Sequence, residues 1–307
     1  MKHLTSLFDV TSSEVLEILK IAADLKAETQ SGKRQPLCAG KVLTQVFEKP
    51  SLRTRVSFEA GISQLGGTSI FLHGKEAGLQ GREEILDIAR VLGGYSDLIV
   101  LRTFSQQLIE TVAKHAGCPV VNALSDDYHP CQALTDVMTI LEHAGSIEGK
   151  EILFVGDGNN VAKSLALACG HVGAKFTLAA PEGYLLADEF IQRLQSQFPD
   201  LKFDQTTDPF AVVNRADVIY TDVWASMGQE EEKDQRSAAF ANFQVNLELL
   251  DAAPGQALFM HCLPARRGLE VTEEVMNDSR SIVFEQAENR MHLAKGLIVW
   301  LLEHASK

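Results

Sequence analysis

Apolar and polar positions follow two different periods along this chain. Near its start, Thr11 and Glu14 have the spacing of a capping box, and apolar residues then recur at helical intervals. Further on, short apolar runs bounded by turn residues alternate with longer stretches of helical period, which predicts βα repeats. The strands predicted in the first half are Val42–Phe47, Ser69–His73, Asp97–Leu101 and Val120–Leu124.

A second series of the same kind follows a long helical pattern over Cys131–Ala144. The strands predicted there are Ile152–Val155, Phe176–Ala179, Val218–Thr221, Ala257–His261 and Ile282–Phe284. The last segment, Asn289–His304, again has helical period, and we expect it to pack against the first half of the chain.

The strand runs are almost wholly apolar, which is typical of parallel strands covered by helices on both faces. At about 150 residues per domain, a length of 307 residues indicates two domains. We therefore predict an α/β fold in which two doubly wound parallel-sheet domains flank a cleft. A long helix joins them, and the C-terminal helix packs back on the first domain. The predicted domains are residues 1–140 with 287–307, and residues 141–286.

Composition excludes several functional classes. The chain has 28 lysines and arginines against 41 aspartates and glutamates, and a formal net charge of −13 repels polyanions, so we expect no nucleic-acid partner. No apolar run approaches the roughly 18 residues that span a bilayer, and Met1–Glu14 lacks the apolar stretch of a signal peptide. We expect a cytoplasmic protein that does not bind membranes. The five cysteines are scattered without a C-x-x-C pair, which disfavours a disulfide framework or a zinc site.

The segment Phe47–Arg55 gathers cations and hydroxyls where a predicted strand gives way to a helix. Its polar side chains include Lys49, Ser51, Arg53, Thr54 and Arg55. The N–H groups at a helix start favour an anion, and arginine adds a fork that matches phosphate oxygens. A capped helix with a solvated charged face fits the residue types equally well. The strand-to-helix context and the acidic background favour the anion site.

Two further strand ends carry similar groups. Arg102 follows the strand Asp97–Leu101, and His129 and Gln132 lie one turn apart at the start of the next long helix. Taken singly, such an arginine is most often at the surface and such a histidine is most often structural. Three strand ends that offer donors for phosphate or carbonyl oxygens are less easily explained as structural, which favours a ligand site at the carboxyl edge of a sheet.

Glycines and asparagines follow the first strand of the second half. Gly156 and Gly158 resemble the start of a dinucleotide-binding loop, but Val161 stands at the third glycine position and no acidic residue ends the next strand. These departures disfavour NAD. Asn159 and Asn160 either cap a helix or present an amide to a polar ligand.

Asp222 and Cys262 each follow a predicted strand of the second half. Asp222 precedes a glycine-containing loop and the acidic run Glu230–Glu232, an arrangement that suits recognition of an ammonium group beneath a loop. Cys262 is either a nucleophile or, like most cysteines beside apolar strands, a packing residue.

Four motifs in this order resemble those of the ornithine carbamoyltransferase family, anabolic type, over essentially the whole chain. The family patterns are S-T-R-T-R, H-P-x-Q, D-x-x-x-S-M-G and H-C-L-P. Here they correspond to Ser51–Arg55, His129–Gln132, Asp222 with Ser226-Met-Gly228, and His261–Pro264. Aspartate carbamoyltransferases lack the last two motifs, and relatives that use acylated ornithine lack S-M-G, so the resemblance selects ornithine.

The resemblance also implies roles for individual residues. Carbamoyl phosphate would contact Ser51, the Leu52 backbone N–H, Arg53, Thr54, Arg102, His129, Gln132, Cys262, Leu263 and Arg290. Ornithine would contact Asn160, Asp222, Ser226 and Met227. Arg102, His129 and Cys262 would be the catalytic residues, with no cofactor and no metal. The expected assembly is a homotrimer or a multiple of trimers. Many relatives receive a glutamine from a neighbouring subunit, and Gly78 aligns with it here, two positions before Gln80.

The implied reaction is attack of the ornithine side-chain amine on the carbamoyl carbon, giving citrulline and phosphate in arginine biosynthesis. It needs no covalent intermediate, so we assign Cys262 a positioning role. One alternative is a two-lobed protein that binds an anionic metabolite without turnover. Others are a carbamoyltransferase for a related amine and an NAD-dependent oxidoreductase that depends only on Gly156-x-Gly158.

Overall fold

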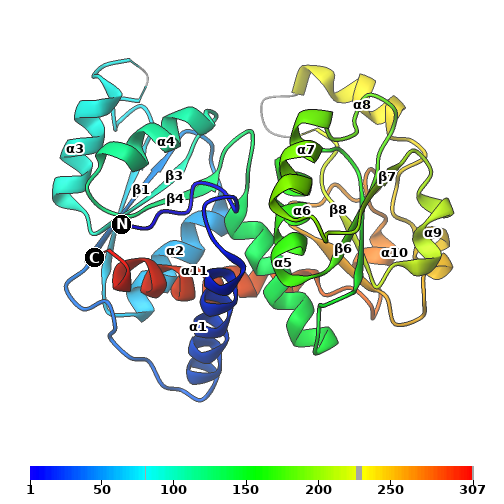
Figure 1. Cartoon of the computed structure of the whole chain (residues 1–307), viewed down its shortest axis with the longest axis horizontal. Coiled ribbons are helices and arrows are strands. Elements are labelled where there is room, and N and C mark those ends of the chain that lie inside the picture. Colours follow the sequence, from blue (N-terminus) through cyan, green and yellow to red (C-terminus); the bar gives the residue numbers. More distant parts are fainter. Residues whose placement is uncertain (80, 226–229, 306–307) are drawn as a thin grey trace. The chain divides into compact units, whose positions relative to one another are not determined.

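The computed structural model describes residues 1–79, 81–225 and 230–305, and the backbone divides into two units. One unit consists of Met1–Met138 with Glu288–Lys307, and the other of Thr139–Ala287. Helix α5 (Pro130–Ala144) contains the boundary between them. Each unit has its own sheet with surrounding helices (Figure 1). Within the described ranges, no helix is long and apolar enough to cross a membrane.

The first unit is built on a parallel sheet of order β2-β1-β3-β4. A helix follows each strand, because parallel neighbours need a crossover connection. The strands are β1 (Val42–Phe47), β2 (Thr68–His73), β3 (Leu98–Arg102) and β4 (Val120–Leu124), and the helices that follow them are α2 (Leu52–Gln64), α3 (Ile85–Tyr95), α4 (Gln106–His115) and α5.

Helix α1 (Ser12–Gln30) begins with the predicted capping box. The Thr11 hydroxyl accepts the Glu14 N–H at 3.3 Å, and the Glu14 carboxylate accepts the Thr11 N–H at 2.8 Å. Helix α11 (Val283–Glu303) packs against α1, since Lys295 Nζ donates to Thr29 Oγ1 at 2.7 Å and Trp300 Nε1 donates to Glu17 Oε2 at 2.8 Å. The C-terminal helix therefore packs back on the first unit, as predicted.

The second unit contains a parallel sheet of order β7-β6-β5-β8-β9. Its strands are β5 (Glu151–Val155), β6 (Lys175–Ala179), β7 (Phe203–Thr206), β8 (Val218–Thr221) and β9 (Leu258–His261). Its helices are α6 (Asn160–Val172), α7 (Asp188–Gln197), α8 (Lys233–Ala239), α9 (Leu247–Ala252) and α10 (Glu273–Met276). Phe240, Val245 and Phe259 are fully buried in its hydrophobic core.

The two parallel α/β sheets confirm the predicted fold class, and β1, β4 and β8 coincide with their predicted ranges. The strand predicted at Ile282–Phe284 is wrong. Ser281 forms a single bridge with Phe259 and the chain then enters α11, because three apolar residues fit the first turn of a buried helix as well as a strand. The prediction also missed β7, a short and mostly half-buried strand.

Candidate active site

The anion-binding segment predicted at Phe47–Arg55 lies at the carboxyl edge of the first sheet. Phe47 and Arg102 are register partners at the ends of β1 and β3. Ser51 is the N-cap of α2, with an extended backbone, and its hydroxyl accepts the Thr54 N–H at 3.2 Å. The start of α2 therefore lies beside the end of β3, as parallel βα topology requires.

The three cations of this segment have different surroundings. Lys49 is buried, pairs with Asp126 and lies 4.3 Å from the centre of the Phe104 ring. Arg55 pairs with Glu59 at 2.9 Å and lies over Phe71. We therefore interpret Lys49 and Arg55 as structural charges. Arg53 differs from them, because its positive charge lowers the pKa of His129.

His129 is the centre of a cationic cluster in the first unit. Its side chain is buried, and burial is the main cause that holds the pKa of its imidazole well below the usual value of 6.5. The positive charges of Arg290, Arg102 and Arg53 lower the pKa further. The imidazole is therefore neutral at pH 7, with three guanidinium groups around it in a chain whose net charge is −13.

Arg290 joins the predicted residues from α11. Its Nη2 donates to Thr54 Oγ1 at 3.2 Å, and its Nη1 donates to Gln132 Oε1. Gln132 in turn donates to Asp136 Oδ1 at 2.8 Å, which fixes the orientation of its amide. Motif reasoning did not identify Asp136. Its signal was the i,i+4 spacing from Gln132 on one helix.

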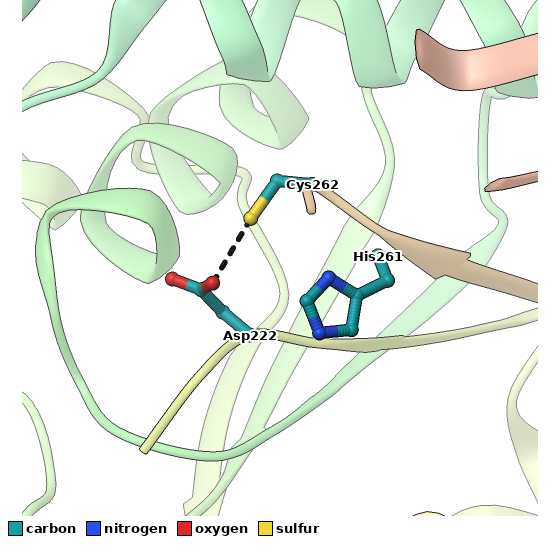
Figure 2. A group of neighbouring side chains, drawn as sticks. All are labelled: Asp222, His261 and Cys262. Atoms are coloured by element: carbon teal, nitrogen blue, oxygen red, sulfur yellow. Dashed lines mark hydrogen bonds between the residues drawn. The ribbon is translucent and has the colours of Figure 1, made fainter. Parts of the chain in front are cut away.

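A second polar cluster follows β5, β8 and β9 in the other unit. Asp222 is buried, and its Oδ1 accepts a hydrogen bond from Cys262 Sγ at 3.0 Å (Figure 2). The same oxygen accepts the Val223 N–H at 2.8 Å. Its Oδ2 accepts from Asn159 Nδ2 at 3.0 Å. The carboxylate thus links the carboxyl edges of three strands.

The two asparagines after β5 differ in whether they cap helix α6. Asn159 is the N-cap of α6, since its Oδ1 accepts the N–H groups of Val161 at 2.9 Å and Ala162 at 3.1 Å. The same side chain holds Asp222 through its amide nitrogen, a contact absent from the predicted site. Asn160 is the first residue of α6 and is half-buried.

His261 holds the segment that carries Cys262. Its Nδ1 accepts the Leu263 N–H at 2.9 Å, which places the ring proton on Nε2, 3.3 Å from the fully buried Glu270 carboxylate. Leu263 has a positive φ of 58°, a conformation that a branched side chain adopts only where its surroundings impose it. Glu270 was also missed, because it lies nine positions after His261, in the connection between β9 and α10, outside any motif.

Asp222, His261 and Cys262 offer ligand atoms within 4.8 Å of one another, a spacing that a metal ion could use (Figure 2). Both ring nitrogens of His261 already make hydrogen bonds, one to a backbone N–H and one to Glu270. The imidazole is therefore committed to shaping the loop, and the donor set does not fit a metal centre.

Other predicted residues stand apart from these contacts. Ser226, Met227 and Gln80 lie outside the described residues. The Leu52 side chain is 73% exposed, so any role in the first unit's cluster falls to its backbone. Gly78 has a φ of 82° in the turn after β2.

Two family models match nearly the whole chain. The carbamoyl-P binding domain of aspartate/ornithine carbamoyltransferase matches residues 2–142, and the Asp/Orn binding domain matches residues 148–301. The first match contains the cationic cluster except for Arg290, and the second contains Asp222 and Cys262.

Full-length relatives give the same picture. The chain is 46% identical over 307 residues to an ornithine carbamoyltransferase of Acinetobacter baumannii, covering 100% of this chain and 99% of that protein. It is 47% identical over 303 residues to an ornithine carbamoyltransferase of Thermococcus kodakarensis, covering 98% of this chain and 96% of that protein. The solved ornithine carbamoyltransferase of Pyrococcus furiosus superposes with a TM-score of 0.95 at 44% identity, covering 98% of this chain and 97% of that one. With both domains matched in order along its length, the chain belongs to the aspartate/ornithine carbamoyltransferase family.

Proposed function

We propose that this protein transfers the carbamoyl group of carbamoyl phosphate to the side-chain amine of L-ornithine, giving L-citrulline and phosphate in arginine biosynthesis. The observation that carries the proposal is the neutral, buried His129 with the charges of Arg53, Arg102 and Arg290 around it. Such a cluster suits a phosphate group, and full-length relatives named ornithine carbamoyltransferase support the choice of reaction.

The first unit would bind carbamoyl phosphate through its cationic cluster. Ser51, Thr54 and the Leu52 N–H lie at the N-terminus of α2, where the helix dipole favours an anion, and Arg53 and Arg290 add charge-assisted contacts. Gln132, held by Asp136, would orient the carbamoyl group. Arg102 and His129 would donate to the carbonyl oxygen and stabilise the negative charge that develops on it during attack.

The second unit would hold ornithine. Asp222 would accept hydrogen bonds from its α-ammonium group, and Asn160, Ser226 and Met227 would complete the contacts to its α-amino and α-carboxylate groups. An alkylamine with a lysine-like pKa of about 10.4 is neutral in only about one molecule in a few thousand at pH 7, so the site must favour the neutral form. Cys262 and Leu263 would orient this amine, and the departing phosphate would accept its proton.

The test is carbamoyl transfer measured side by side with ornithine, acetylornithine, putrescine and aspartate. We expect citrulline from ornithine and at most traces of product from the other three. Transfer to putrescine in preference to ornithine would indicate a carbamoyltransferase for a related amine. Tight binding of carbamoyl phosphate with no transfer to any of the four would indicate a non-catalytic binding protein.

We also propose a cytoplasmic homotrimer, or a multiple of trimers. Large apolar side chains are exposed on the first unit at Leu52, Val56 and Ile70, and β2 is an edge strand of its sheet, a combination that suits an interface. The free thiols, among them buried Cys38 and Cys118, suit a reducing compartment. Analytical ultracentrifugation at micromolar concentration should give a trimer or larger species, and a monomer would contradict the assembly.

A further inference from the structure

A buried arginine lies close to the proposed ornithine site without belonging to it. Arg236 of α8 is 7% exposed and lies outside the four motifs. Its Nη1 donates to Asp157 Oδ2 at 2.8 Å and to the Trp224 carbonyl oxygen at 3.1 Å, and its Nε donates to Glu232 Oε2 at 2.8 Å. The guanidinium therefore bonds to the loops after β5 and β8 and, through Glu232, to the start of its own helix.

Two of these segments carry the proposed ornithine ligands. Asp157 lies in the loop after β5, two residues before Asn159, and Trp224 lies in the loop after β8, two residues after Asp222. Asn159 and Asp222 are themselves hydrogen-bonded at 3.0 Å. Arg236 thus joins the same two loops that the hydrogen bond between Asn159 and Asp222 connects.

The loop after β5 also makes a backbone hydrogen bond to the segment of Tyr184. The Gly158 N–H donates to the Tyr184 carbonyl at 2.8 Å, and a Cβ at position 158 would lie 2.8 Å from that oxygen, so only glycine permits the approach. The Tyr184 ring in turn lies 5.1 Å from the Arg236 guanidinium carbon. Gly158, which resembles part of a dinucleotide-binding loop, therefore serves close backbone packing against the segment of Tyr184.

Charge explains why an arginine is needed here. Burial raises the pKa of the Asp157 carboxyl, the nearby charges of Asp222 and Glu232 raise it further, and Arg236 opposes them. Without the guanidinium, the largely buried Asp157 carboxylate would feel the charge of Asp222 with no compensating cation beside it. Asp157 would then take up a proton or move, and in either case the loop that positions Asn159 would shift.

We propose that Arg236 is a positioning residue for ornithine binding, which acts by joining the loop of Asp157 and Asn159 to the loop of Asp222 and Trp224. The inference rests on the proposed function and extends it to a residue that does not touch either substrate. It predicts that loss of Arg236 weakens ornithine binding and leaves carbamoyl phosphate binding, in the other unit, unchanged.

The same unit offers a matched control. Arg280 also bonds two carboxylates and one carbonyl: Nε donates to Asp278 Oδ1 at 2.8 Å, Nη2 to Asp251 Oδ1 at 2.7 Å and Nη1 to the Leu250 oxygen at 3.2 Å. It precedes α11, and these hydrogen bonds join α9 to the turn before α11 rather than to the loops of Asp157 or Asp222. Arg280→Gln removes an equivalent network away from the site.

The experiment measures KM for each substrate, kcat and the melting temperature for Arg236→Gln, Arg236→Lys, Arg280→Gln and wild type. We expect Arg236→Gln to raise the ornithine KM at least tenfold with the carbamoyl phosphate KM within twofold. Arg236→Lys keeps the charge and should recover part of the loss. Arg280→Gln should lower the melting temperature while its ornithine KM stays within twofold of wild type.

A second arm tests the charge argument. Asp157→Asn combined with Arg236→Gln removes the buried carboxylate together with its partner, so the double variant should bind ornithine better than Arg236→Gln alone. Should Arg236→Gln fail to fold, Arg236→Lys decides the question, with an increase of at least threefold expected in the ornithine KM alone.

Several outcomes overturn the inference. The first is an ornithine KM within twofold of wild type in the folded Arg236 variants. The second is an equal rise in the KM values of both substrates. The third is a rise in the ornithine KM of Arg280→Gln that equals the rise in Arg236→Gln. If wild-type protein makes no citrulline, the proposed function fails and the inference fails with it. Active wild-type protein with an unaffected Arg236 variant contradicts the inference alone.

Discussion

The polar clusters of the two units differ in how their charges are compensated. In the first unit, the positive charges of Arg290, Arg102 and Arg53 lower the pKa of His129 below what burial alone gives. In the second unit the central charge is the Asp222 carboxylate, which already accepts hydrogen bonds from Asn159, Val223 and Cys262. The first cluster therefore presents positive charge that suits an anion, whereas the carboxylate of the second is internally satisfied by these three hydrogen bonds. Substitutions in the first should therefore have larger effects on ligand binding and turnover.

The largest effect is expected at Arg102. Replacing it by glutamine removes a charged donor from the developing oxyanion, and loss of one such donor commonly costs about 3 kcal/mol, or about 100- to 1,000-fold in kcat. Steady-state kinetics of Arg102→Gln should show this loss, and Arg102→Lys should recover only part of it because the planar fork is missing. A kcat within fivefold of wild type in Arg102→Gln would contradict the role.

Arg53→Gln comes next and should act on binding. A charge-assisted contact to phosphate is worth about 1.5 to 3 kcal/mol, so carbamoyl phosphate affinity should fall about tenfold to a hundredfold. Calorimetric titration measures it. Arg55→Gln is the matched control two positions away, because Arg55 pairs with Glu59 and lies over Phe71. Equal affinities for the two variants would show that Arg53 is an ordinary surface charge.

The internally satisfied cluster predicts a milder result for Cys262→Ala. Asp222 keeps its bonds to Asn159 and Val223, and water can partly replace a positioning thiol, so turnover should fall about tenfold, or about 1.4 kcal/mol. Activity should remain measurable. Rapid quench with labelled carbamoyl phosphate tests the mechanism directly, because a carbamoylated protein would overturn direct transfer.

The same contrast separates what the sequence could predict from what it could not. Strand positions and caps depend on neighbouring residues, so the capping box at Thr11 and the N-cap at Ser51 could be inferred from spacing alone. Lys49 contacts Asp126 and Phe104, and Arg55 contacts Phe71. These partners are distant in the sequence, so local spacing could not show that the two cations have structural contacts of their own. Arg290 meets Thr54 across 236 positions of sequence, and only the fold, or a family resemblance, brings them together.

The second cluster was less accessible to sequence reasoning. Asn159 and Asn160 are the same residue type at adjacent positions, and the backbone of the α6 start determines which of them caps the helix and reaches Asp222. Glu270 and Arg236 lie outside every motif, because their contribution is to hold loops that other residues use. Residues that act through such indirect contacts carry no signature in a single sequence.

The smallest predicted effect concerns the pH dependence of stability. The pKa of His129 lies well below 6.5 in the folded protein because of burial and three positive neighbours, while the unfolded chain has the ordinary value of about 6.5. Between the two values the unfolded state binds the proton and the folded state does not. Stability is therefore lost as pH falls from about 6.5 toward the folded pKa, and it is retained above 6.5.

For one such histidine the free energy of unfolding should fall by about 1 kcal/mol between pH 6.5 and pH 5.5. Denaturant unfolding of wild type and His129→Gln at both pH values measures this term as the difference between their pH dependences. Phosphate ions bound in the cationic cluster would offset the charges of Arg53, Arg102 and Arg290 and raise the pKa of His129, so the difference should shrink in phosphate buffer. Identical pH dependences of wild type and variant in a buffer without anionic ligands would show that the imidazole titrates normally and that the cationic cluster does not act on it.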